Sequence, residues 1–223
     1  MRRAASALAL SSLALSSLAL SACATRPKAV VAVEPIVEAA EPKEWEKIVT
    51  PADRARLAAL PDQWRRARAA VPRRAAGKLA AEGPLADPAA ALDLPTPPPG
   101  PYHCRLVRFG ARAGIASFPP DFCYVETSGG GLSFTKQTGG NLPQGWLHED
   151  SPKREVFLGT TGPGRYGDDP ARDVVGVVER VSPFRWRLVL TRAGRGAVLD
   201  VYELVPVTPE VPGAKPAVPS TKS

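Results

Sequence analysis

Histidine and cysteine are scarce in this chain of 223 residues, which has two histidines and three cysteines. A zinc site needs three or four ligands, and neither His103 nor His148 has a second histidine at helical or hairpin spacing. The sequence has no Gly-x-Ser-x-Gly pattern, the turn that presents the serine of many hydrolases. Its three consecutive glycines, 129–131, precede a predicted strand rather than a helix that would bind phosphate. We therefore predict no metal, no cofactor and no catalytic residue.

The densest group of carboxylates is Asp168, Asp169 and Asp173. Its spacing is not that of an EF-hand loop, and Arg172 lies within it. We expect Asp169 to cap a short helical turn that begins at Pro170. These carboxylates are therefore predicted to shape a loop rather than to bind a cation.

After the first twenty residues the chain has no apolar run long enough to cross a membrane as a helix. Arg2 and Arg3 precede an uncharged stretch of Leu, Ala and Ser, and the small residues Ser21 and Ala22 precede Cys23. A positive start, an apolar stretch and a small-residue cleavage site are typical of a secretory signal peptide. The string Leu-Ser-Ala-Cys resembles the lipobox of bacterial lipoproteins, in which the cysteine thiol receives a diacylglycerol before cleavage.

We predict that residues 1–22 are the signal peptide and that Cys23 is the lipid-bearing first residue of the mature protein. The alternatives are an ordinary secreted protein and an uncleaved anchor, although five serines dilute the apolar stretch. Residue 24 is Ala rather than Asp, which by the same resemblance favours the outer membrane, facing the periplasm. Removal of Arg2 and Arg3 lowers the formal charge from +7 to +5, so we expect no nucleic-acid partner in that compartment.

With Cys23 carrying lipid, Cys104 and Cys123 remain as an even pair in an oxidising compartment. We predict a structural disulfide between them, which would stabilise the fold by roughly 3 kcal/mol in the chain-entropy model. The alternative is a redox or metal-binding pair, but the sequence has no Cys-x-x-Cys spacing.

Residues 45–94 are predicted to be helical, after a lipidated tether over 23–44. Thr50 is a good N-cap, since Pro51 occupies the first helical position and Asp53 favours the helix dipole. Pro61 predicts a kink or a restart at Asp62. One helical face carries apolar side chains at spacings of three and four: Leu57, Leu60, Trp64, Ala67 and Val71. The other face carries arginines that we expect to be solvated rather than bound to anionic lipid: Arg65, Arg66, Arg68, Arg73 and Arg74.

We expect that helical segment to end at Gly83-Pro84, and a further short helical turn to begin at Asp87-Pro88. Residues 95–100 read as a stiff proline-rich connector, residues 95–206 as a β domain, and residues 207–223 as an unfolded proline-rich tail. Eight short strands separated by turn residues are predicted at 102–109, 122–127, 132–137, 144–148, 155–160, 174–181, 185–191 and 197–205.

The absence of helix-length crossovers between these strands predicts an α+β fold with an antiparallel meander, closed or partly closed into a small barrel of about eight strands. An open sandwich is the second choice. Along 185–191, Trp186 and Leu188 alternate with Arg185 and Arg187, the period of a half-buried strand. Asp200 and Glu203 are expected to form cross-strand pairs with Arg185 or Arg187.

Several strings together resemble a family of bacterial lipoproteins, the domain of unknown function 4893. The strings are Trp45 with residues 50–54, 82–85, 100–105, 132–136, 156–160, 172–176, 185–190 and 199–206. The resemblance covers roughly Trp45 to Pro206. It implies membership of the family but no mechanism, because no activity is established for that family.

We expect a non-enzymatic cell-envelope lipoprotein whose barrel binds a protein partner or a small apolar ligand. One version is protease inhibition by the segment before the barrel, by architectural analogy alone. A purely structural role in envelope maintenance is the alternative. An envelope hydrolase that uses His148 with Glu149 or Asp150 is less favoured, because an orienting carboxylate seldom adjoins its histidine in sequence.

Overall fold

The computed structural model describes residues 41–110, 112–129, 131–140 and 142–208. The predicted signal peptide, Cys23, most of the tether and residues 209–223 lie outside these ranges. In the described part of the chain, no helix has both the length and the apolarity needed to cross a membrane.

Six short helical elements precede the barrel. They are α1 (Glu44–Ile48), α2 (Pro51–Ala58), α3 (Leu60–Ala69), the 3-10 turn η1 (Arg73–Ala75), α4 (Ala76–Ala81) and the 3-10 turn η2 (Gly83–Ala86). Thr50 is the N-cap of α2, as predicted, and its hydroxyl accepts a hydrogen bond from the Asp53 N–H at 3.2 Å. The helical face that contains Leu60, Trp64 and Ala67 is buried, as its spacing predicts.

The predicted restart at Asp62 is two residues too late. Helix α3 begins at Leu60, so Pro61 lies in its first turn, where a missing N–H costs no hydrogen bond. Gly83-Pro84 likewise starts η2 rather than ending the helical segment, because proline also fits the first turn of a 3-10 helix. Asp87 opens a turn at the predicted place, and its side chain accepts from the Ala89 N–H at 3.0 Å, but the turn is not helical.

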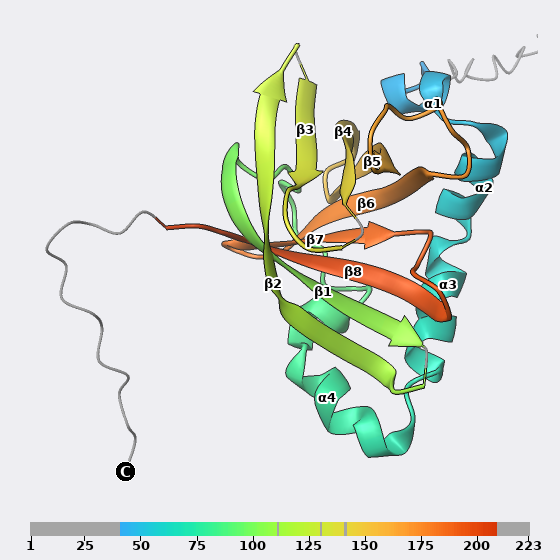
Figure 1. Cartoon of the computed structure of the whole chain (residues 1–223), viewed down its shortest axis with the longest axis vertical. Coiled ribbons are helices and arrows are strands. Elements are labelled where there is room, and N and C mark those ends of the chain that lie inside the picture. The colour runs from blue at the N-terminus through green and yellow to red at the C-terminus, as the bar shows by residue number, and fades with distance from the viewer. Residues whose placement is uncertain (1–40, 111, 130, 141, 209–223) are drawn as a thin grey trace, which may run out of the picture. The chain divides into compact units, whose positions relative to one another are not determined.

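Eight antiparallel strands then close into a barrel in chain order, with the last strand paired to the first (Figure 1). The strands are β1 (Gly100–Gly110), β2 (Gly114–Ser128), β3 (Gly131–Lys136), β4 (Pro143–Ser151), β5 (Arg154–Thr161), β6 (Asp173–Ser182), β7 (Arg185–Leu190) and β8 (Ala197–Pro206). The predicted closed barrel is therefore confirmed over the open sandwich.

Strand β2 is longer than predicted, because it begins at Gly114 rather than at Phe122. Its residues 114–121 pair with β1, whereas pairing with β3 starts only at Cys123. Pro119 and Pro120 lie in this part of β2, whose other edge has no β3 partner. An unpaired edge tolerates proline because no N–H is needed for a hydrogen bond on that side. In a strand paired on both sides, the same prolines would predict a break.

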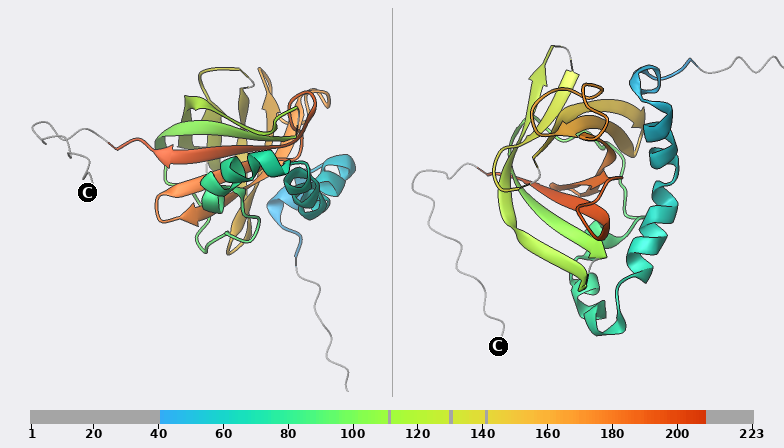
Figure 2. Two further views of the ribbon diagram at one scale, coloured as in Figure 1. Left: turned by 90° about the horizontal axis from the view of Figure 1, so that it is seen from below. Right: turned by 45° about the vertical axis from the view of Figure 1, so that its right-hand side comes forward.

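The barrel is packed with side chains. One buried cluster takes residues from all eight strands, so it must lie inside: among its members are the disulfide, Phe134 against Phe157, and Tyr102 against Trp186. A second cluster, which includes Trp64, Phe109, Val189 and Leu199, joins the outer wall to the helices. Figure 2 shows these helices along one side of the barrel.

This helical layer corrects one prediction about β7. The alternation of Trp186 and Leu188 with Arg185 and Arg187 is real, but the second face is not solvated. Arg187 is fully buried and Val189 lies beneath the helices. The strand is therefore covered on both faces for most of its length.

Candidate binding site at one mouth of the barrel

Three hairpin turns meet at one end of the barrel, which we call the mouth: β2–β3, β4–β5 and β6–β7. The chain also enters β1 and leaves β8 at this end, because strands alternate in direction. Residues 95–99, Pro-Thr-Pro-Pro-Pro, lie here and are called the proline segment. The sequence predicts a stiff connector at this point, and the structure adds that this connector is bound to the mouth.

The proline segment is held at several points around the mouth. Just before it, the Leu92 N–H donates to the Arg180 carbonyl of β6 at 2.8 Å, and the Leu94 N–H donates to the Pro152 carbonyl in the β4–β5 turn at 3.0 Å. Within it, Thr96 donates to the Glu155 carboxylate of β5, and Pro98 accepts from the Tyr102 hydroxyl of β1 at 2.6 Å. The segment therefore bridges β5 and β1.

Two of the side chains that hold the proline segment, Glu155 and Tyr102, are buried and titratable. Burial raises the pKa of Glu155, the hydrogen bond from Thr96 opposes that effect, and the neighbouring Glu149 adds to it. Burial also raises the pKa of Tyr102 to about 12, so its hydroxyl stays a donor at neutral pH. The mouth thus holds the proline segment with groups that favour their protonated forms.

A groove of about 510 Å³ lies on one side of the proline segment, and we call it the apolar groove. Leu94 and Phe184 line it and are the most exposed large apolar side chains of the described residues, at 74% and 76%. Trp186 also lines it, and its buried indole N–H has no hydrogen-bond partner among the described residues. The groove therefore combines exposed apolar surface with an unused donor.

Leu94 also has an unusual backbone, with a φ of 61° in the left-handed region that disfavours residues other than glycine. Pro95 disfavours the right-handed helical region for Leu94, but this restriction alone would favour extended backbone rather than a left-handed one. Strain of this kind persists where the surroundings fix it, here through the Leu94 N–H bond to Pro152.

A second cavity, of about 750 Å³, lies on the other side of the proline segment and includes His148, Glu149 and Glu155. Burial lowers the pKa of His148, and Glu44 opposes this effect. His148 and Glu149 lie at adjacent positions of β4 and so point to opposite faces of the sheet.

Asp150 binds Lys43, Trp45 and Arg154 rather than His148. Its Oδ1 accepts from Lys43 at 2.8 Å and from the Trp45 indole at 3.2 Å, and Arg154 forms an ion pair with Oδ2. Burial would raise the pKa of Asp150, but the bonds from Lys43 and Arg154 outweigh it and the pKa is lowered. Asp150 therefore holds α1 against the barrel.

Asp169 caps a turn that includes Pro170, as predicted, and the neighbouring carboxylates also bind backbone N–H groups. Asp169 accepts from the Ala171 N–H at 2.9 Å at the start of a turn, and Asp168 accepts from the Arg165 N–H at 2.7 Å. Asp173 accepts from the Gly167 N–H at 3.0 Å. All three shape the β5–β6 loop. His103, the other histidine, lies on β1 and is exposed.

The charge pairs of β8 are predicted correctly for Glu203 and wrongly for Asp200. Glu203 binds Arg185, as predicted, and also Arg105 at 2.6 Å. Asp200 instead accepts two bonds from Arg108, both at 2.7 Å. Side chains alternate between the two faces of a strand. Asp200 therefore points into the barrel with Tyr202, whereas the arginines of β7 lie between inward-pointing residues and point outward.

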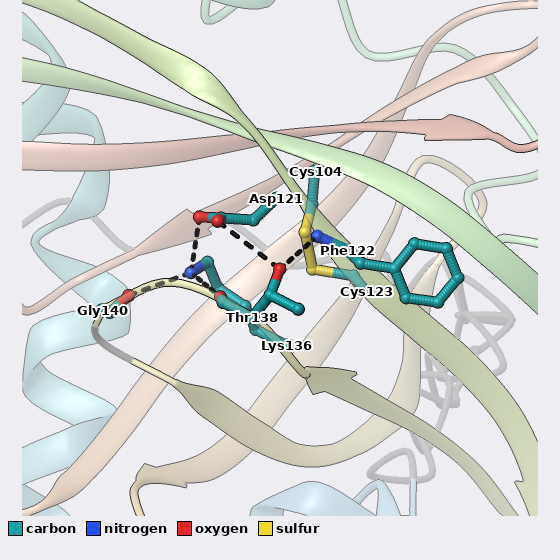
Figure 3. Close-up of a disulfide and its surroundings, with 7 residues drawn as sticks. All are labelled: Cys104, Asp121, Phe122, Cys123, Lys136, Thr138 and Gly140. Atoms are coloured by element: carbon teal, nitrogen blue, oxygen red, sulfur yellow. Dashed lines mark hydrogen bonds and ion pairs between the residues drawn. A yellow bond between two sulfur atoms is a disulfide. The ribbon is translucent and has the colours of Figure 1, made fainter.

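The predicted disulfide joins Cys104 of β1 to Cys123 of β2, with 5.8 Å between their Cα atoms (Figure 3). Both cysteines are fully buried inside the barrel. Lys136 lies nearby, and its ammonium binds Asp121 at 2.7 Å and the Thr138 carbonyl at 2.6 Å. A polar cluster thus adjoins the disulfide on the side away from the mouth.

The fold and the site define a class: a closed, eight-stranded antiparallel barrel with a packed interior, a helical layer on one side and an apolar groove at its mouth. The chain belongs to the family described as Domain of unknown function (DUF4893), whose model matches residues 45–204. That range runs from α1 into β8 and confirms the resemblance drawn from the sequence. No curated protein and no solved structure matches the chain.

Proposed function

We propose that this chain is a non-enzymatic cell-envelope lipoprotein whose apolar groove binds a segment of a protein partner. Lipid on Cys23 would hold it at the outer membrane, facing the periplasm. The observation that carries the binding site is that Leu94 and Phe184, both largely exposed, line one groove beside the unused Trp186 N–H. Contiguous exposed apolar surface on a soluble domain marks an interaction site.

The packed interior favours a protein segment over a small molecule held within the strands. Small barrels that carry a ligand need a hollow interior, but aromatic pairs and the disulfide fill this one. A small apolar ligand is the alternative, and it would have to bind in the groove, whose volume suits one. Nucleic acid is not a proposed partner.

Three other roles have less support. The segment before the barrel is bound to its own mouth, with Pro95 and Pro97 buried, so it is not a free loop for insertion into a protease. A hydrolase at His148 would need a carboxylate that Asp150 already gives to Lys43 and Arg154. A purely structural envelope role ranks second, because it leaves the exposed groove without a use.

Photo-crosslinking in the cells that make the chain tests the proposal. A crosslinking amino acid at Phe184 should capture a protein, whereas one at Leu142, which is exposed at the opposite end of the barrel, should not. Equal capture at both positions, or none at Phe184, would contradict the proposal. Adducts with small molecules alone would favour the alternative ligand.

A pair of variants separates binding from folding. Phe184→Ser removes an exposed side chain, and Leu94→Gly relieves the left-handed backbone, so neither should destabilise the fold. With the crosslinking amino acid moved to Thr208, which also lines the groove, we expect each substitution to reduce capture of the partner at least several-fold, with urea midpoints at or slightly above that of the parent chain. Unchanged capture in both variants would exclude the groove as the binding site.

A further inference from the structure

The apolar groove has the features that recognise an extended proline-rich strand. A polyproline II strand has no internal hydrogen bonds, so its carbonyls are free to accept, and proteins bind it in grooves lined by aromatic residues. Tyr102 and Trp186 line this groove and pack edge to face, with ring centroids 6.3 Å apart. Phe184 and several prolines line it as well.

The molecule already binds one such strand in the same place. The Tyr102 hydroxyl donates to the Pro98 carbonyl at 2.6 Å, which is how an aromatic donor holds a proline-rich strand. The Trp186 indole next to it has an equivalent donor that no described residue uses. One aromatic donor of the mouth is therefore bound to the proline segment, and its neighbour has no acceptor in the part of the chain that the structure describes.

The chain outside the described residues supplies a matching ligand. After β8 ends, the Val207 N–H donates to the Pro101 carbonyl at 2.9 Å, and Val207 and Thr208 line the groove. The sequence then continues as Pro-Glu-Val-Pro over 209–212, with a second Pro-x-x-Pro at 216–219. Prolines three apart lie on one side of a polyproline II strand, which has three residues per turn.

Charge agrees with this assignment. Arg180 lines the groove, and its Nε is buried without a hydrogen-bond partner among the described residues. The first proline motif contains Glu210, and the second contains no acidic residue. The first motif also begins one residue beyond Thr208. A tether this short gives a millimolar effective concentration, enough to hold a weak motif in place.

We infer that residues 209–212 of the chain's own C-terminal segment bind in the apolar groove as a polyproline II strand, with the Trp186 N–H donating to one of their carbonyls and Glu210 near Arg180. This rests on the proposed function in one respect, since it assigns the same groove. It adds that the segment and a protein partner would compete for the same groove.

Nitrogen-15 NMR of the four tryptophan indoles tests the inference. The Trp186 indole signal of the full mature chain should differ from that of a chain ending at Thr208, and a synthetic peptide of residues 207–219 should restore it. The truncated chain should also bind that peptide at least tenfold more tightly than the full chain, which has its own competitor. An identical Trp186 signal in both chains would overturn the inference.

Matched proline variants fix the register. Pro209→Ala with Pro212→Ala should reproduce the truncated spectrum, whereas Pro216→Ala with Pro219→Ala should leave the full-length spectrum unchanged. The reverse result would overturn the assignment to residues 209–212, and a signal that depends on protein concentration would mean that the segment binds a second copy. If the tail has no effect but crosslinking at Phe184 still captures a protein, the inference that residues 209–212 bind in the groove fails and the proposed function stands.

Discussion

Arg187 shows how much of this fold depends on single buried charges. Its guanidinium is fully buried and donates to Glu179 at 2.7 Å and to the Leu85 and Asp87 carbonyls at 3.2 and 2.6 Å. It also lies 5.2 Å from the ring centre of Trp64. One side chain thus joins β7 to β6, to η2 and to α3, and a lysine would lack the planar fan of donors that this requires.

We expect Arg187→Met to lower the free energy of unfolding by about 3–5 kcal/mol, because it leaves the partly buried Glu179 carboxylate and the buried Leu85 carbonyl without their donor. Urea denaturation measures the loss. Arg74→Met is the matched control, since Arg74 is exposed on η1 and its replacement should change stability by less than about 0.5 kcal/mol. Equal effects of the two substitutions would show that the buried network contributes little.

The raised pKa of Glu155 predicts that its contribution to the free energy of unfolding changes with pH in the opposite direction to that of the paired carboxylates. A carboxyl whose pKa is raised by folding holds its proton more tightly in the native state, so stability falls as the pH rises above the ordinary value of 4.5 and through the raised pKa. Glu155→Gln does not titrate and still offers an oxygen to Thr96. It should therefore unfold at higher urea than the parent at pH 7 and at the same urea near pH 4.

Glu126, exposed on β2, supplies the control for Glu155. Glu126→Gln should leave the difference in stability between pH 4 and pH 7 as it is in the parent chain. If Glu155→Gln is instead less stable than the parent at pH 7, the ionised carboxylate must be the form that binds the proline segment.

Among the elements, strands with a clear period of two were predictable and strands with unusual edges were not. The alternation in β7 and the turn residues between strands follow directly from the sequence. The first half of β2 does not, because Pro119 and Pro120 signal a break unless the missing β3 partner is known. The burial of Arg187 was equally hidden, since it depends on helices that pack from elsewhere in the chain.

The pairing of β1 with β2 makes a prediction about the disulfide. Replacing both Cys104 and Cys123 by Ala should lower the free energy of unfolding by roughly 3 kcal/mol, because 19 residues separate the cysteines. The long β1–β2 ladder should keep the strands in register, so the circular dichroism spectrum should stay native. Thermal melts measure the change.

Reduction gives an independent check of the same quantity. Because both cysteines are fully buried, reductant should act only on opened molecules. The parent chain reduced in urea and refolded should melt at the temperature of the double variant. A double variant as stable as the oxidised parent would show that the link does not restrict the unfolded chain.

At the scale of the whole molecule, eight strands without crossovers predict a closed barrel. They do not predict that the proline segment binds across the mouth of that barrel. A run of prolines predicts stiffness but not a binding partner. The groove at the mouth combines Tyr102, which follows the proline segment closely in sequence, with Phe184 and Trp186, which lie far from it along the chain. Only the closed barrel brings these residues to one place, so no local pattern marks them.

The proposed position of the molecule in the cell depends on Cys23, which lies outside both the described residues and the part matched by the family, 45–204. If the proposal holds, Cys23→Ser should move the protein out of the membrane fraction, because the acyl chains would supply the anchoring energy at ~0.8 kcal/mol per buried CH₂. Ala24→Asp should keep the lipid but shift the protein from the outer to the inner membrane. Mass spectrometry of the native chain should find the acyl groups on Cys23 and no leader before it. A free thiol at Cys23 would contradict the lipoprotein assignment. So would a Cys23→Ser chain that stays in the membrane fraction, because something other than lipid on that sulfur would then hold the protein there.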